Sequence, residues 1–323
     1  METKNAAVTR KKERRSDLYR KLGPLIALIV LMLIVTVLNV NFIRPANLLN
    51  LLRQVSVNAL IAFGMTFVII TGGIDLSVGS TLALSSALTA GIIAIGVPPV
   101  LAIVTGLLIG AFLGMINGLL ITKGNVAPFI GTLATMTIYR GLTLVYTEGN
   151  PITGFGGGFA FQFFGRGYLF GIPFPVIITT AAFIILFVIL HKMTFGRKTF
   201  AIGGNEQAAY IAGIKSDRVK TMVYAISGMM SALAGLILTS RLNSAQPTAG
   251  TAYELDAIAA VVIGGTSLAG GKGRIVGTLI GALIIGTLNN GLNLLGVSSF
   301  YQQVVRGIVI IIAVLLDRKN KKT

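Results

Sequence analysis

The amino-acid sequence predicts an all-α, polytopic integral membrane protein with about ten transmembrane helices and an internal duplication. Composition is the first observation behind this prediction. Only 11% of the 323 residues are charged, and the mean hydropathy is +0.84, whereas soluble domains carry about a quarter charged residues. The second observation is a series of continuous apolar runs, several of which reach the ~20 residues that cross a hydrocarbon core as a helix. Because the runs lack alternation with period two, helices are expected rather than a barrel.

Ten apolar segments are the candidate membrane spans, within one transmembrane domain at residues 22–318. The first begins at Pro24 and is too long for the apolar region of a signal peptide, so an uncleaved span is expected. The eighth is short, which indicates a broken or partly re-entrant helix. The ten segments are residues 24–42, 52–71, 79–97, 99–121, 127–147, 174–192, 219–240, 252–264, 275–294 and 299–316.

The basic residues predict which side of the membrane each connection faces. The net charge is +17, and Lys and Arg cluster in the tail 1–21, in residues 192–220 and in the tail 319–323. This is the positive-inside distribution of a membrane protein. It is not a basic face on a folded domain, so nucleic acid is excluded as a partner. The segments expected in the cytoplasm are both termini and residues 72–78, 122–126, 193–218 and 265–274.

Several kinds of chemistry are excluded by what the chain lacks. It has no Cys and one His, so disulfides, thiolate metal sites and histidine metal clusters are not available. No nucleophile, base and acid form a recognisable set, so we expect neither an enzyme nor a bound cofactor. The glycine-rich residues 265–273 miss the P-loop pattern, because Gly273 follows Lys272 where a Ser or Thr is required.

The longest polar interruption, residues 192–220, predicts a short surface helix. Asn205 suits its N-cap, Glu206 its first turn, and Gly213 the position after its end. Such a helix between two spans is a good shape for docking a partner. An ordinary cytoplasmic loop remains the alternative on these residues alone.

Polar residues within the spans are candidates for a translocation path. Amides and carboxylates hydrogen-bond the hydroxyl groups of an uncharged solute, but the same groups also join helices structurally. Asp75 can cap the span that begins near Gly79 or act in gating. Glu254 and Asp256 could pair with Arg140, Arg241 or Arg306. The path candidates are Gln54, Asn58, Asp75, Glu254, Asp256, Asn289, Asn290 and Asn293.

Residues 148–173 form a long external segment rich in Gly, Phe and Pro. It could pack on the membrane surface, meet an external partner, or serve only as a connector. The chain also carries traces of duplication, in which residues 72–79 resemble 264–271, and residues 117–141 resemble 290–307 in scattered positions. The two matches imply different orientations, so the orientation of the repeat stays open.

The chain resembles the permease subunits of bacterial ABC sugar importers, most closely the ribose-import members. The resemblance extends over residues 22–318 and is carried by four motifs at residues 71–79, 201–206, 240–250 and 253–271. The spacing of Glu206, Ala208, Ala209 and Gly213 is similar to the coupling loop of that family.

The resemblance implies a multi-pass protein of the bacterial cell membrane, acting by alternating access as a homodimer. It also implies an extracytoplasmic sugar-binding protein and a separate ATPase subunit, which holds the ATP and Mg²⁺. The residues that it assigns to ATPase coupling are Gly203, Gly204, Asn205, Glu206, Ala208, Ala209, Gly213 and Ile214.

Two other functions remain open on the residues alone. An ion-coupled secondary transporter of a small polar solute could use unwound carbonyls at the glycine-rich breaks near 72–79 and 264–273. A membrane scaffold or receptor subunit is supported only by the partner-like loop.

Overall fold

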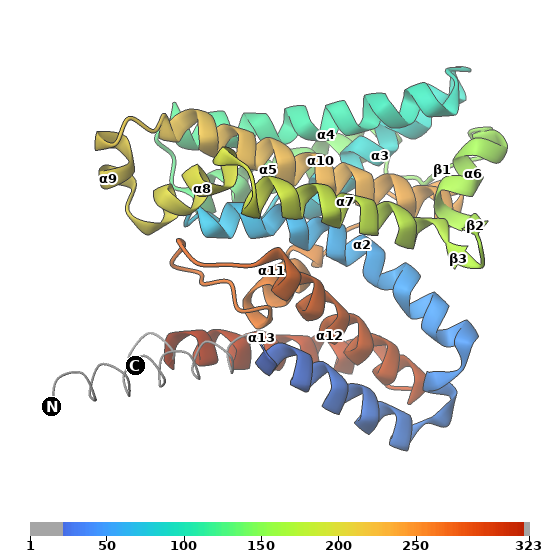
Figure 1. Cartoon of the computed structure of the whole chain (residues 1–323). Coiled ribbons are helices and arrows are strands. Elements are labelled where there is room, and N and C mark those ends of the chain that lie inside the picture. The colour runs from blue at the N-terminus through green and yellow to red at the C-terminus, as the bar shows by residue number, and fades with distance from the viewer. Residues whose placement is uncertain (1–21, 320–323) are drawn as a thin grey trace, which may run out of the picture.

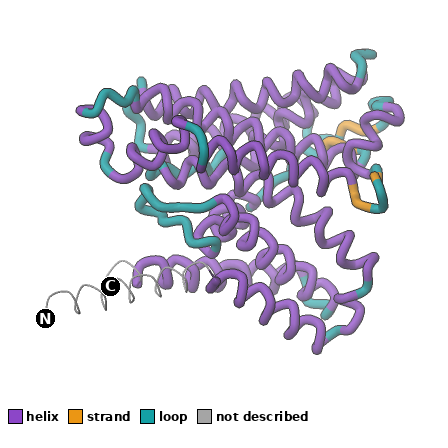
Figure 2. Tube along the Cα trace, in the orientation of Figure 1, coloured by secondary structure: helices purple, strands orange, loops and turns teal. Residues whose placement is uncertain are grey.

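The computed structural model describes residues 22–319, and most of these residues are helical (Figure 2). The predicted tails, apart from Lys319, lie outside the described residues. The helices are Leu22–Leu38, η1 (Val40–Ile43), α2 (Pro45–Ile70), α3 (Val78–Ala94), α4 (Pro99–Thr122), α5 (Pro128–Thr147), α6 (Gly158–Arg166), α7 (Phe174–His191), α8 (Thr194–Gly204), α9 (Glu206–Ile211), α10 (Ser216–Leu242), α11 (Tyr253–Ile263), α12 (Ile275–Leu294) and α13 (Ser299–Lys319). The strands are β1 (Ile152–Thr153), β2 (Tyr168–Leu169), β3 (Ile172–Pro173) and β4 (Ser244–Ala245).

Each of the ten predicted spans coincides with a helix, so the all-α fold class is confirmed. Five of these helices, α2, α4, α7, α10 and α12, are long and apolar enough to cross a membrane. The eighth predicted span, α11, has 11 residues, or about 16 Å at 1.5 Å per residue. It cannot cross a hydrocarbon core of ~30 Å alone, which agrees with the broken helix expected there.

The helices form two groups that meet along α2 (Figure 1). One group is a bundle of α2, α3, α4, α5, α7 and α10, and the other contains α11, α12, α13 and the helix Leu22–Leu38. Burial identifies the centre of the fold. The most apolar window is 83% buried in α2 and 72% buried in α10, but 28% buried in both α4 and α7. The outer helices therefore present apolar side chains outward, as lipid requires.

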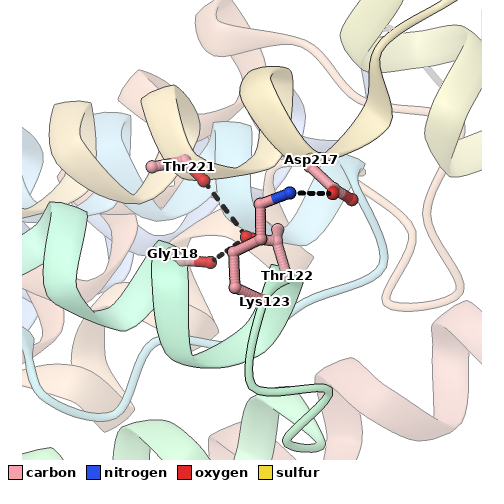
Figure 3. Close-up of polar contacts among 5 residues, drawn as sticks. All are labelled: Gly118, Thr122, Lys123, Asp217 and Thr221. Atoms are coloured by element: carbon pink, nitrogen blue, oxygen red, sulfur yellow. Dashed lines mark hydrogen bonds and ion pairs between the residues drawn. The ribbon is translucent and has the colours of Figure 1, made fainter.

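A glycine stripe on α4 brings its backbone against α10. Gly110, Gly114 and Gly118 recur every four residues and so share one face of the helix. A Cβ built at Gly114 or Gly118 would collide with the backbone of α10, at Tyr224 and Thr221. At the end of this contact the Thr122 hydroxyl donates to the Gly118 carbonyl at 2.8 Å, and Lys123 pairs with Asp217 at 3.2 Å (Figure 3).

Residues 148–173 are more than a connector. They contain β1, α6 and the β2–β3 hairpin, and β1 pairs antiparallel with β4, which follows α10. These elements lie at one end of the molecule, and α8 and α9 lie at the other (Figure 1). We call the first the hairpin end and the second the α9 end. The internal duplication and the single-domain organisation stay predictions.

Candidate functional site

The predicted surface helix in residues 192–220 is present as α9. Asn205 has an extended backbone, and its side-chain oxygen accepts from the Ala208 N–H at 2.9 Å. Gly213 has a φ of 79°, and the Ile214 N–H donates to the Ala209 carbonyl at 3.0 Å. The cap and the terminating glycine therefore act as expected. The preceding helix α8 is an element that the sequence interpretation left in the loop.

The outward face of α9 joins acidic and apolar groups. Ala209 is buried and anchors the helix, whereas Glu206 and Ala208 are exposed. Tyr210 and Ile211, which the sequence interpretation missed, are 74% and 85% exposed. A groove of about 400 Å³ runs between α9 and the start of α10, lined by Glu206, Gln207, Tyr210, Ile211, Ser216 and Asp217. Exposed Tyr and Ile beside carboxylates form a surface suited to another protein.

Gly203 ties this loop to the end of α2. A Cβ built on Gly203 would collide with the Ile70 carbonyl oxygen and would lie 2.6 Å from the Gly271 nitrogen. The Gly271 N–H in turn donates to the Ile70 carbonyl at 2.9 Å. Gly270 and Gly271 both have positive φ, at 82° and 71°. We call these residues the glycine junction, because α8, α2 and the 265–274 turn meet there backbone to backbone.

Asp75 lies much deeper than the sequence suggested. It is 1% exposed. The sequence interpretation placed it at the end of a span, where a charge stays near water and costs little free energy. The residues between α2 and α3 enter the bundle, so that Asp75 reaches Asn117, which lies five residues before the end of α4. The predicted capping of α3 by this side chain is not formed, because the carboxylate accepts instead from the N–H of Ser77, the residue that precedes α3, at 3.1 Å.

Hydrogen-bond donors from three segments surround the Asp75 carboxylate. One oxygen accepts from the Ser77 hydroxyl at 2.7 Å and from the Asn117 amide at 3.4 Å, and the other accepts from the Ser227 hydroxyl at 2.8 Å. None of the ion pairs formed within residues 22–319 involves this carboxylate. Asp75 therefore links α3, α4 and α10 through neutral donors.

Glu254 lines a cleft between α3, α5 and the start of α11. The cleft has a volume of about 390 Å³, and Ser80, Thr137 and Arg140 also line it. Arg140 donates to the Pro247 carbonyl at 2.5 Å. Within the described residues it forms no ion pair with Glu254, so the cleft keeps a carboxylate and a guanidinium that both have room for a solute.

The remaining acid and the three asparagines join helices. Asp256 pairs with Arg306 at 3.5 Å, and Arg306 also donates to Asn289 at 3.1 Å. Asn290 exchanges two hydrogen bonds with Asn47, and Asn293 accepts from Gln302 at 2.8 Å. These contacts match the structural alternative for the amides.

Gln54 and Asn58 behave differently from those amides. They are half-buried and share one face of α2, since they are four residues apart. No side-chain hydrogen bond is formed by either within the part of the chain that the structure describes. The eight path candidates thus fall into separate groups, and three of them, Gln54, Asn58 and Glu254, form no side-chain hydrogen bond within residues 22–319.

Comparison with known proteins identifies the family. The family described as "Branched-chain amino acid transport system / permease component" matches residues 47–314. The chain belongs to this permease family. It is 69% identical over 320 residues to the ribose import permease protein RbsC of Bacillus subtilis (strain 168), covering 99% of both chains. It is 54% identical to RbsC of Escherichia coli (strain K12), covering 92% of this chain and 93% of the other.

More distant relatives of the permease are named for other sugars. The D-allose transport system permease protein AlsC of Escherichia coli (strain K12) is 46% identical, covering 87% of this chain and 86% of its own. No solved structure matches the permease.

Family membership confirms several predictions. The permease is the membrane subunit of a bacterial ABC importer, which is a transport subunit rather than an enzyme and carries no cofactor. An ABC permease implies an ATPase partner and a binding-protein partner. The ion-coupled transporter and the non-transporting scaffold are therefore left without support.

Proposed function

We propose that this permease imports ribose, which a binding protein delivers and a separate ATPase drives inward. The observation that carries the proposal is the 69% identity, over 99% of both chains, to a protein named as a ribose import permease. Relatives named for D-allose and L-arabinose are only 46% and 40% identical.

The solute path runs past Gln54, Asn58 and Glu254. In support of this path, the three side chains are half-buried and form no side-chain hydrogen bond within the described residues. They can therefore bond the hydroxyl groups of a sugar, which lose water when the sugar enters the protein. Arg140 adds donors at the same cleft as Glu254. Asp75, Asp256, Asn289, Asn290 and Asn293 serve instead as links between the moving helices.

ATPase coupling occurs at the α9 groove. In support, Glu206, Tyr210 and Ile211 are exposed together, while Ala209 holds the helix to the bundle. The glycine junction provides a backbone contact from α8 to the end of α2. Movement of α9 can thereby reach the segment that carries Asp75.

The α9 end faces the cytoplasm in this proposal. The start of Leu22–Leu38, the end of α13 and the α8–α9 loop lie toward the same end of the molecule (Figure 1), and basic residues concentrate there. Because the chain has no Cys, single cysteines can be labelled selectively. Gln207→Cys should react with an impermeant maleimide only in inverted vesicles, and Asn150→Cys only in right-side-out vesicles. The opposite pattern would reverse the topology.

The permease acts as a homodimer in this proposal, as the family resemblance implies. Light scattering of the purified permease in detergent measures the protein mass of the particle. A mass of one chain, in a preparation that supports uptake after reconstitution, would contradict the dimer.

Uptake by vesicles tests the transported solute and the energy source. The permease is reconstituted with its ATPase and binding protein, and labelled ribose is offered outside with and without ATP on the α9 side. We expect ATP-dependent uptake that unlabelled ribose suppresses and that allose and arabinose do not. ATP-dependent uptake of another sugar would contradict ribose as the transported solute, but not the ATP-driven mechanism. Uptake that follows an ion gradient without ATP would overturn the mechanism.

A further inference from the structure

The α6 and β2–β3 unit at the hairpin end exposes a cluster of aromatic and aliphatic side chains. Phe170 is 94% exposed and Phe159 is 82% exposed. Tyr168, Leu169 and Ile172 are exposed beside them. Clusters of this kind mark contact with a partner or a membrane.

The turn of the hairpin holds Phe170 outward. Phe170 and Gly171 are the two residues between β2 and β3, and their φ angles are 53° and 77°. Two positive φ values define a type I′ turn, in which Asn, Asp or Gly is preferred at the first position. An aromatic residue there costs stability, and its side chain makes no compensating burial within the protein.

Two helices place this cluster at a definite depth. Helix α7 has 18 residues and begins directly after β3, so the hairpin lies about 27 Å from the far end of α7. Tyr168 also meets Arg53, which is 17 residues before the end of α2 at Ile70, or about 25 Å along its axis. A hydrocarbon core is ~30 Å thick. Both measures put the cluster at the boundary between hydrocarbon and headgroups.

The charges near the cluster complement phospholipid headgroups. Arg53 donates to the Tyr168 hydroxyl, and its guanidinium carbon lies 5.0 Å from the centre of that ring. Arg166 donates to the Arg241 carbonyl at 2.8 Å. Arg53 and Arg166 form no ion pair within residues 22–319, so their charges are available for phosphate oxygens.

We propose that the α6 and β2–β3 unit inserts its aromatic side chains into the headgroup boundary of the lipid bilayer, where Arg53 and Arg166 meet phosphates. This unit leads directly into α7, a helix long and apolar enough to span a membrane, which exposes Ile184, Ile185 and Val188. Phe163 of α6 packs on Phe174 of α7 with ring centres 4.9 Å apart. Lipid is favoured over the binding protein as occupant because of this continuity with a membrane-spanning face. Tyr is enriched at that boundary, and Tyr168 is exposed within the cluster.

Fluorescence quenching tests this proposal directly, because the chain contains no Trp. Phe170→Trp is reconstituted as the full-length permease into phosphatidylcholine vesicles that carry bromine either near the glycerol backbone or deep in the acyl chains. Phe112→Trp, on an exposed face near the middle of α4, is the deep reference. Tyr210→Trp, on exposed α9, is the aqueous reference.

We expect the Phe170→Trp variant to lose most of its indole fluorescence to the shallow bromines, less to the deep ones, and almost none to aqueous iodide. Quenching by iodide without quenching by lipid would place the hairpin in water and overturn the proposal. Protection from both quenchers would mean that a second copy of the permease covers the hairpin, and this would overturn the proposal. A change in quenching when the binding protein is added would mean that the binding protein covers the hairpin, and this would overturn the proposal as well. Phe159→Trp provides a second site should Phe170→Trp fail to fold.

Discussion

The Asp75 carboxylate accepts a hydrogen bond of 2.8 Å from the hydroxyl of Ser227, 152 residues later in the chain. This contact joins the unwound segment after α2 to the middle of α10. Helix α10 begins beside α9, and α2 ends at the glycine junction. One buried carboxylate therefore ties the segment that follows α2 to α10.

Replacing Asp75 should lower the stability of the permease by an amount that depends on how many hydrogen-bond acceptors the new side chain keeps. Asp75→Ala removes the acceptor from Ser77, Asn117 and Ser227 and leaves their donors buried, at a cost of about 1–3 kcal/mol. Asp75→Asn keeps one carbonyl oxygen, so we expect a smaller loss in thermal unfolding experiments in detergent. Asp217→Ala removes an exposed carboxylate and should change nothing. Equal unfolding temperatures for Asp75→Ala and wild type would contradict the linking role.

Glu206→Lys should abolish uptake and permease-stimulated ATP hydrolysis without lowering the unfolding temperature. Glu206 forms an ion pair with Lys220 at 2.5 Å, and its side chain is 51% exposed. The Lys220 side chain is only 19% exposed, but an ion pair with one solvent-exposed partner contributes about 1 kcal/mol, so the fold should tolerate the change.

The charge swap separates the two roles of Glu206. Glu206→Lys with Lys220→Glu restores an ion pair within the chain but presents the wrong charge to the ATPase. We expect the swapped protein to remain inactive. Recovery of ATP hydrolysis by the swap would show that only the internal pair matters. Glu148→Lys, at the opposite end, is the matched control and should be active.

Adjacent glycines offer a matched test of the glycine junction. Gly203→Ala places a methyl group against the backbone of Ile70 and Gly271, and we expect a loss of about 1–3 kcal/mol from this overpacking. A Cβ at Gly204 would meet nothing within 4 Å. Gly204→Ala should therefore unfold at the wild-type temperature. If both variants unfold alike, the junction is looser than the structure indicates.

The ion pair of Asp256 with Arg306 should show coupling in a double-mutant cycle. The Asp256 side chain is 4% exposed, so Arg306→Met leaves a buried carboxylate with one partner fewer, at a cost of about 1–3 kcal/mol. Arg306→Met combined with Asp256→Leu should recover much of that loss. Lys123→Met breaks an exposed pair instead and serves as the control. Additive losses in the cycle would mean that the two charges do not interact.

Local signals in the sequence predicted local structure well. Asn205 and Gly213 define α9 through rules that depend on a few neighbouring residues, and the apolar runs place the spanning helices. The weak eighth run correctly indicated a short helix. Long-range features were harder to see. Asp75 stands between two apolar runs, which is where a surface connection belongs, and nothing local shows that the backbone turns inward to meet Asn117 and Ser227.

The candidate site was predictable to different degrees in its two parts. The α9 residues were identified by spacing, but Tyr210 and Ile211 were missed because apolar residues in a short amphipathic segment suggest burial. The asparagines of α12 were grouped by helical position, which cannot show that Asn290 faces Asn47 on a helix far away in the chain. Partners for side chains depend on how helices cross, and that information is spread over the whole sequence.

The stripe of Gly110, Gly114 and Gly118 has a consequence for how variants of this permease should be interpreted. All three positions are buried against α10, and a single added methyl group at any of them would force α4 away from α10. Loss of uptake after such a change would therefore indicate that α4 has moved, and not that a functional side chain has been removed. A residue can be indispensable because of the room it leaves.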